Sequence, residues 1–215
     1  MGVFEDFLLE HGIALTEKQL GQLEIFEKAL IEKNAVMNLV SPKDEKLLRT
    51  RHFLDSLAAV PVIKKHVRPG GRIADCGSGA GFPGIPLSAV FPENPFDLLD
   101  SLNKRCIFLN EAAAAAGLAN VKAIQKRVGE GRPEPVYSLM TERAMGHLET
   151  VMPLCARLLK KGGHFLAWQS AAQVHAVRPE VEAAAKKAHL SHAGKYSYRL
   201  PGEENDRYIL IFVKI

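Results

Sequence analysis

Four glycines lie close together in the segment 75–84, which reads Asp-Cys-Gly-Ser-Gly-Ala-Gly-Phe-Pro-Gly. Glycine lets a backbone turn sharply and approach a ligand closely, because it has no Cβ. Asp75 at the start of this segment can accept a hydrogen bond from an amide of the turn or reach a cationic ligand. These residue types predict a ligand-binding turn, although a tight strand-to-helix turn without a ligand has the same composition.

Two classes of ligand use such a turn. A dinucleotide needs the pattern Gly-x-Gly-x-x-Gly with its pyrophosphate on a helix N-terminus, and Gly79, Gly81 and Gly84 have that spacing. Their pattern begins late after the preceding strand, and two nearby prolines remove amide donors from the helix start. S-adenosylmethionine instead needs room for its methionyl group, which the turn around Gly79 offers. It also needs an acid for its ribose hydroxyls, and Asp100 offers one unless it caps the following helix.

The elements that must position this turn alternate along the chain after the Pro-Gly-Gly at 69–71. Short apolar runs indicate buried strands, and longer segments with helical periodicity indicate helices. The Lys-Lys-Gly-Gly at 160–163 is expected to stop one helix, and Pro179 is a candidate break in another. We predict strands over 72–76, 96–100, 121–126, 136–142 and 164–169, and helices over 85–91, 104–116, 148–159 and 171–189. This alternation predicts an α/β fold whose parallel strands carry helices on both faces.

The two ends of the chain differ from this alternating part. Residues 1–60 are predicted to be helical, with a capping box at Thr16 and Gln19 and a second helix start at Ser41 and Pro42. Two strands over 191–200 and 207–215 are separated by a turn-rich loop and form an antiparallel pair. The predicted organisation is therefore a helical extension over 1–60 packed on one domain over 61–215.

Composition limits the class of protein. The 215 residues are 47% hydrophobic and 24% charged, as in an ordinary globular protein. No apolar run is close to the length of a membrane span, which is about 18 residues. The first residues do not form a signal-peptide pattern. Three cysteines without metal-ligand spacing predict neither a metal site nor a disulfide framework, which fits a reducing cytoplasm. The net charge of +4 permits a polyanionic partner without requiring one.

Several motifs along nearly the whole chain resemble those of one family, the bacterial small-subunit rRNA guanine-N7 methyltransferases, or glucose-inhibited division protein B family. The resemblance is carried by the turn 75–86, by Leu99-Asp100-Ser101 with Lys104-Arg105, by Asn38-Leu39-Val40, by the segment 51–57 (Arg-His-Phe-Leu-Asp-Ser-Leu), and by Glu142-Arg143-Ala144, which is similar to the family's Ser-Arg-Ala signature.

This resemblance implies a Rossmann-like, seven-stranded methyltransferase sheet with an antiparallel last strand. It also implies transfer of the methyl group of S-adenosylmethionine to N7 of one guanosine in a conserved loop of 16S rRNA, so that the small ribosomal subunit is the partner. Cofactor contacts carried over from the family fall on Gly77, Phe82, Val128, Gly129 and Arg143, with Asp100 at the ribose.

Two departures from the family's pattern matter. The family usually has an acidic residue where this chain has Gly129, so that only a backbone contact to the adenine could be retained there. It usually has Lys-Gly after the fifth strand, where this chain has Gln169 and Ser170. The second departure removes a positive charge near the side expected to face RNA.

Methylation of guanine N7 uses a free lone pair and releases no proton, so we expect no general base. Arg143 is expected to position the reactants, although a surface ion pair is an alternative role for it. His52 could stack on an unpaired base or simply pack between helices. The other candidates for RNA contact are the basic residues Arg49, Arg51, Lys104 and Arg105, each of which alone could be a solvated charge.

Three other functions remain open at this point. A small-molecule methyltransferase would need an apolar lid, whereas the N-terminal segment offers basic residues. A nicotinamide-dependent dehydrogenase is disfavoured by the late glycine spacing. A cofactor- or RNA-binding homologue with reduced activity would be consistent with Gly129 and Gln169.

Overall fold

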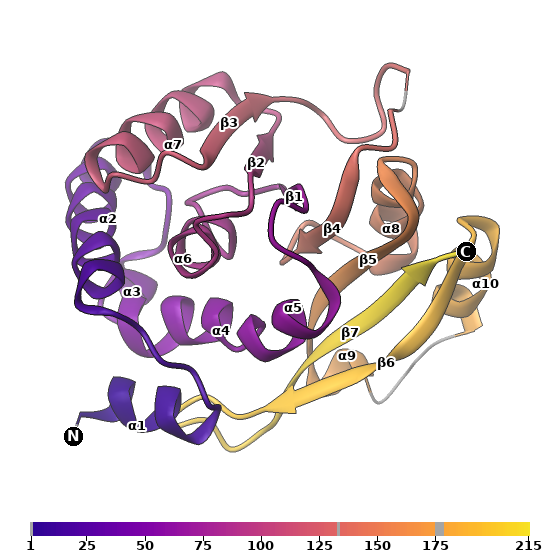
Figure 1. The fold of residues 1–215 in the computed structure, drawn as a ribbon. Coiled ribbons are helices and arrows are strands. Elements are labelled where there is room, and N and C mark those ends of the chain that lie inside the picture. The colour runs from indigo at the N-terminus through magenta and orange to yellow at the C-terminus, as the bar shows by residue number, and fades with distance from the viewer. Residues whose placement is uncertain (1, 133, 175–178) are drawn as a thin grey trace.

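The computed structural model describes residues 2–132, 134–174 and 179–215. Its centre is a seven-stranded sheet with the order β3-β2-β1-β4-β5-β7-β6 (Figure 1). The strands are β1 (Ile73–Cys76), β2 (Phe96–Asp100), β3 (Val121–Gln125), β4 (Tyr137–Glu142), β5 (Leu159–Ser170), β6 (Leu190–Tyr198) and β7 (Arg207–Lys214). Within the described residues, no helix has both the length and the apolar character needed to cross a membrane.

Strands β1 to β5 are parallel to one another, and β7 runs antiparallel to β5 and β6. The predicted α/β class and the antiparallel last strand are thus confirmed. Every residue of β1 and β2 is buried, as expected of parallel strands covered on both faces. The chain proceeds outward from β1 to β3 and then returns to place β4 on the other side of β1. This reversal leaves a crevice at the carboxyl ends of β1 and β4, where open α/β sheets bind ligands.

The predicted helical extension packs on one face of the sheet. It contains α1 (Val3–Glu10), α2 (Glu17–Met37), α3 (Pro42–Glu45), the π-helix η1 (Leu48–Phe53) and α4 (Leu54–Leu57). Helix α5 (Val60–His66) begins at the predicted boundary and continues beyond it. Both predicted caps are present, since Thr16 forms a full capping box with Gln19 and the Ser41 hydroxyl accepts from the Asp44 amide. Phe26 and Phe53 are buried in one core with Phe96 of β2. The division at residue 60 stays a prediction.

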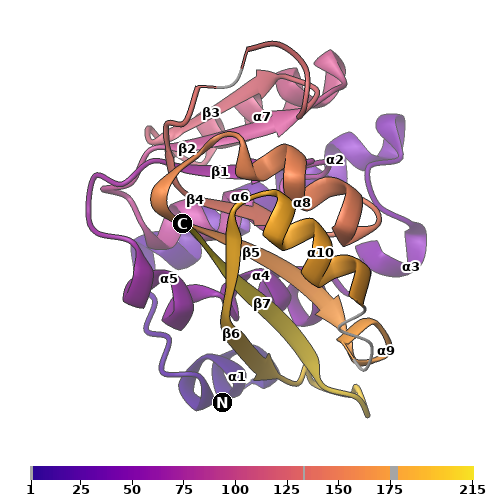
Figure 2. The same ribbon diagram turned by 90° about the vertical axis from the view of Figure 1, so that its right-hand side faces the viewer.

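Two further helices share that face, and the others cover the opposite one. Helices α6 (Gly84–Val90) and α7 (Asn103–Ala115) pack with the extension, in contact with α2. Helices α8 (Leu148–Ala156) and α10 (Pro179–Lys187) lie on the near face of the sheet in Figure 2, and the short α9 (Ala171–Val174) follows β5. Pro179, the candidate break, is the first residue of α10, a position that proline favours. The part of the predicted helix 171–189 that spans 175–178 lies outside the described residues.

The prediction for the segment 160–163 was wrong. Helix α8 ends at Ala156, and the Lys-Lys-Gly-Gly segment belongs to β5. Pairing with β4 jumps there from Tyr137 opposite Leu159 to Leu139 opposite His164, so the extra residues bulge out of the ladder. Glycine permits this bulge, because Gly162 has φ +76°.

Candidate active site

Two cavities open at the carboxyl ends of β1 and β4. The turn cavity, of about 410 Å³, is lined by the glycine turn 77–80, His52 and Phe82. The strand cavity, of about 440 Å³, is lined by Glu142 at the end of β4 and by Trp168 and Gln169 of β5. Five residues line both cavities and form the junction between them: Arg51, Asp55, Arg143, Ala144 and Arg207.

The glycines of the turn are under different steric constraints. Gly77, Gly79 and Gly81 all have positive φ, at +68°, +55° and +102°. A Cβ on Gly77 would collide with the Met145 side chain, and one on Gly81 would press on Phe26 at 2.9 Å. A Cβ on Gly79 would meet only the Gly77 carbonyl oxygen, at 3.7 Å. Gly79 is therefore the position in the turn where open space is left for a ligand.

Asp75 is part of the support beneath the turn. Its Oδ2 accepts from the Gly84 amide at 3.2 Å and its Oδ1 from the Thr141 hydroxyl at 2.8 Å. Burial raises the pKa of Asp75 to about 6, although these hydrogen bonds oppose the rise. Of its two predicted roles, the hydrogen bond to a turn amide is confirmed. The other predicted role, contact with a cationic ligand, does not fit the structure, because the Asp75 side chain is fully buried.

Asp100 connects the turn to the end of β2. Its Oδ2 accepts from the Gly79 amide at 3.0 Å, and its Oδ1 accepts from the Leu102 amide at 2.9 Å. The side chain of Arg105 approaches the same Oδ2 at 3.4 Å. Asp100 is not the N-cap of α7, since Leu102 holds that position. The contact of Asp100 with a ribose stays a prediction. The structure adds a second role for Asp100, which is to fix the glycine turn through the Gly79 amide.

Arg143 lies at the junction and points inward. Its Nη1 donates to Asp55 Oδ2 at 2.8 Å, and its Nη2 lies 3.1 Å from His52 Nδ1. The guanidinium also sits 5.3 Å from the centre of the Phe82 ring. With its side chain only 16% exposed, Arg143 is not the surface ion pair that the sequence left open. Its position is fixed on three sides.

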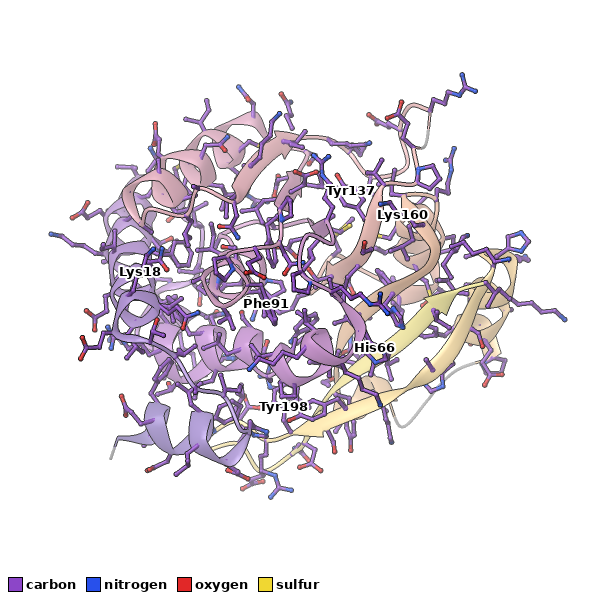
Figure 3. The ribbon with its side chains drawn as sticks, in the orientation of Figure 1. Lys18, His66, Phe91, Tyr137, Lys160 and Tyr198 are labelled. Atoms are coloured by element: carbon purple, nitrogen blue, oxygen red, sulfur yellow. The ribbon has the colours of Figure 1, made fainter. Side chains whose placement is uncertain are left out.

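Asp55 is the centre of this network, and it was missed as a site residue from the sequence. Its carboxylate also accepts from Arg207 Nη1 at 3.1 Å and, at 2.6 Å, from the hydroxyl of Tyr198, whose side chain is labelled in Figure 3. Its carbonyl oxygen accepts from the Trp168 indole at 2.8 Å. Burial alone would raise the pKa of Asp55, but the two guanidinium groups outweigh it and lower the pKa below its ordinary value. Asp55 is therefore held as a carboxylate.

His52 packs within the protein, as its alternative interpretation predicted. Its ring stacks on Phe82 with a centroid separation of 5.2 Å, and its Nε2 lies 3.6 Å from Asp44. Burial, with a contribution from Arg143, lowers the pKa of His52 to about 4. The ring is thus neutral at physiological pH. Its contact with an RNA base stays a prediction, since His52 also lines the turn cavity.

The structure separates the predicted basic residues into three places. Arg51 lines the junction and pairs with Asp44 at 3.0 Å. Lys104 is exposed at the start of α7 and precedes Arg105 beside Asp100. Arg49 lies apart from the junction, where its Nε donates to Glu27 at 2.7 Å and its Nη2 lies 3.5 Å from Glu24. Contact of these side chains with RNA stays a prediction.

The two departures from the family's pattern have local explanations. Gly129 has φ +102°, and a Cβ there would lie 3.0 Å from Leu154, so an acidic side chain would be strained. Val128 beside it is buried. Contacts of Val128 and Gly129 with the adenine stay predictions. Gln169 donates to the Trp168 carbonyl at 2.7 Å and gives the wall of the strand cavity an amide where the family has a cation.

Glu142 is a second residue that the sequence did not single out. It is 1% exposed, and its Oε1 accepts from the Met145 amide at 2.7 Å. Its Oε2 is buried and has no hydrogen-bond partner among the described residues. Burial raises the pKa of Glu142 to about 7, and the nearby Asp75 adds to the rise, while the Met145 amide opposes it.

The raised pKa of Glu142 predicts a pH-dependent stability difference. Folding favours the protonated form, so its contribution is fully present below pH 4.5 and is lost as pH rises through about 7. Relative to wild type, the Glu142→Gln variant should gain stability between pH 5 and pH 8, by at most about 3 kcal/mol. Urea unfolding at both pH values measures the difference. An equal difference at both would show that the carboxyl is not buried as described.

Comparison with known proteins gives one consistent result. The GidB family model, described as rRNA small subunit methyltransferase G, matches residues 19–208. Ribosomal RNA small subunit methyltransferase G of Staphylococcus haemolyticus (strain JCSC1435) is 37% identical over 215 residues, spanning 96% of this chain and 86% of that protein. The protein of the same name from Staphylococcus carnosus (strain TM300) is 35% identical, spanning 96% of this chain and 87% of its own.

Solved structures share the fold. Geranyl diphosphate methyltransferase in complex with S-adenosylmethionine superposes with a TM-score of 0.62, covering 82% of this chain and 94% of its own. Its sequence is only 14% identical, so this likeness concerns the fold alone.

Proposed function

Because the chain belongs to the GidB family of rRNA small subunit methyltransferases G, we propose that it transfers the methyl group of S-adenosylmethionine to N7 of a guanosine in a conserved loop of 16S rRNA. The observation that carries this proposal is the junction, where Arg143 and Arg207 are held by one buried carboxylate between two cavities. Guanidinium groups bind phosphate, and a cavity beside them can receive a base. The junction therefore suits a nucleotide.

The turn fits S-adenosylmethionine better than a dinucleotide. Gly79 leaves open space, as a methionyl group requires, and Asp100 lies directly behind it. The helix after the turn begins at Gly84 with Pro83 as its N-cap, which leaves few amides to hold a pyrophosphate. We propose that Gly77, Gly79, Phe82, Asp100 and Arg143 hold the cofactor, with Val128 and Gly129 at the adenine.

The protein's contribution to the reaction is orientation in a site with fixed charges. When bound, S-adenosylmethionine supplies an electrophilic methyl group that N7 accepts through its lone pair, so no proton leaves the base. Asp55 fixes Arg143 at the junction, and Arg143 in turn positions the reactants. His52 is neutral and packed against Phe82, which suits it to shape the cavity wall but not to act as a base.

Transfer of label and mapping of the product test this function. Purified protein with tritiated S-adenosylmethionine should label 16S rRNA in small ribosomal subunits. Borohydride followed by aniline should then cleave the RNA chain at a single site, since that treatment breaks RNA at N7-methylguanosine. Labelled RNA without this cleavage would place the methyl group on a carbon or an exocyclic nitrogen. Labelling of small molecules alone would favour a small-molecule methyltransferase.

Asp100→Ala should weaken binding of S-adenosylmethionine by about 1–3 kcal/mol, as expected when a charged hydrogen-bond partner is lost. The variant loses both the proposed ribose contact and the acceptor of the Gly79 amide. Isothermal titration calorimetry measures the change. Asp206→Ala is the control, because it removes a partly exposed carboxylate that pairs with Arg199. Asp97→Ala is less suitable, because Asp97 is as buried as Asp100. An effect below a few tenths of a kcal/mol would leave Asp100 a structural role only.

Arg51 and Arg49 form a matched pair for testing RNA contact. Arg51 lines the junction, while Arg49 is engaged by Glu24 and Glu27. If Arg51 contacts a phosphate, Arg51→Gln should reduce the slope of log affinity against log salt by about 1, and Arg49→Gln should change it less. Fluorescence anisotropy with 16S rRNA at several salt concentrations gives both slopes. A wild-type affinity independent of salt would exclude phosphate contacts altogether.

Two segments of the chain contribute to this function. We propose that residues 1–60 form a helical extension that supplies Arg51, His52 and Asp55 to the site, and that residues 61–215 form the methyltransferase domain. We also propose that the protein acts in the cytoplasm, where its rRNA partner is.

A further inference from the structure

The strand cavity contains a buried carboxyl group with a free acceptor. Glu142 ends β4 between Cys76 of β1 and Ala167 of β5, its register partners on either side. One carboxyl oxygen accepts from the Met145 amide, and the other has no partner among the described residues. A buried polar atom without a partner costs free energy, so its retention calls for a functional reason.

The other acidic residues of the strand cavity do not share this property. Glu203 receives two hydrogen bonds from Arg207, at 2.6 and 2.7 Å. Asp206 is bonded by Arg199 at 2.7–2.8 Å, and Asp55 by the network at the junction. Glu142 lines this cavity and differs from them in having a buried carboxyl oxygen without a hydrogen-bond partner among the described residues.

Guanine has the complementary groups. Its N1–H and exocyclic 2-amino group are donors on the Watson–Crick edge, through which extruded bases are commonly recognised. N7 lies on the other side of the purine, so a base held by its Watson–Crick edge keeps N7 free to react. Adenine presents a ring acceptor at N1, which a carboxylate would repel.

We propose that Glu142 is a specificity-determining residue that accepts hydrogen bonds from the Watson–Crick edge of the target guanine in the strand cavity. This inference rests on the proposed function. The same contact aids the reaction, because methylation at N7 places a positive charge on the purine ring. Glu142 is ionised above a pH of about 7, and its carboxylate touching that ring is then attracted more strongly in the transition state than before it. That difference is the condition for accelerating the reaction.

Inosine at the target position tests the contact. Inosine keeps N7 and N1–H but lacks the 2-amino group. Small subunits reconstituted with 16S rRNA carrying guanosine or inosine at the mapped position are compared for wild type, Glu142→Gln and Glu111→Gln, a change at an exposed carboxylate of α7 that pairs with Lys33 away from both cavities. Wild type should methylate guanosine about 10- to 100-fold faster than inosine, as expected for one hydrogen bond to a charged group. The control Glu111→Gln should keep this ratio.

In Glu142→Gln the guanosine-to-inosine rate ratio should fall to about threefold or less, mainly through a slower reaction of guanosine. The amide has one oxygen, which accepts from Met145, so that its NH2 group, a donor, faces the base. The affinity of this variant for S-adenosylmethionine should stay within about twofold of wild type, and its urea unfolding curve shows that it is folded. A ratio that persists in Glu142→Gln would overturn the inference, and so would a large loss of cofactor affinity. Absence of any N7-methylguanosine with wild type would overturn the proposed function itself and the inference with it.

Discussion

Replacing Asp55 with alanine should reduce methyl transfer to background and lower the free energy of unfolding by about 3–5 kcal/mol. The alanine removes the shared acceptor of Arg143, Arg207 and Tyr198. Two guanidinium groups then lie side by side, partly buried, without the carboxylate between them. Their repulsion should displace Arg143 from the junction, so activity falls even in molecules that remain folded.

Two measurements separate these effects. Urea unfolding gives the loss of stability, and methyl transfer is assayed below the unfolding midpoint of the variant. Asp55→Asn keeps an acceptor but no charge, and it should lie between wild type and alanine in both measurements. Asp206→Asn, at a more exposed ion pair, should change stability by less than about 1 kcal/mol. Full activity of folded Asp55→Ala would mean that Arg143 needs no positioning.

Gly79→Val should abolish detectable binding of S-adenosylmethionine, a loss of more than about 100-fold, while leaving the fold intact. The branched side chain would fill the open space beside the turn, which a Cβ reaches without touching any atom closer than 3.7 Å. Valine is strained at φ +55°, which should cost about 1–2 kcal/mol of stability. Calorimetry measures the affinity, and circular dichroism confirms the fold.

Gly117→Val is the matched control for strain. Gly117 lies two residues beyond the end of α7 with φ +66°, and nothing lies within 4 Å of a Cβ there. It should lose a similar amount of stability and keep its affinity for the cofactor. If Gly79→Val bound the cofactor as tightly as Gly117→Val, the proposed cofactor site would be wrong.

Much of the fold could be predicted from local sequence patterns. The strand 96–100 agreed with β2 at both ends, because an apolar run between turn residues determines a buried parallel strand almost by itself. The helix stop at 160–163 was misassigned for an equally physical reason. A Gly-Gly pair permits either a helix end or a bulge, and only pairing with β4 decides between them.

The site was predictable where its residues are adjacent in sequence. The glycine turn and Arg143 could be identified from motifs, and both line the cavities. Arg207 and Tyr198 could not, since neither carries a local signal and each meets Asp55 only through the folded sheet. Glu142 was recognised only as part of a signature. The sequence could not show that one of its carboxyl oxygens is left without a partner, because this follows from the loop after β4, whose Met145 amide donates to the other oxygen only.

The network around Asp55 also determines when during synthesis the site can exist. Asp55 meets Arg143 across 88 residues, Tyr198 across 143 and Arg207 across 152. A nascent chain that has emerged only as far as β5 carries the glycine turn and Arg143, but not the strand that brings Arg207. Contacts between such distant residues form late, because long loops must close first. The cofactor turn can therefore fold while the chain is still being made, whereas the junction is completed only after β7 has paired with β5.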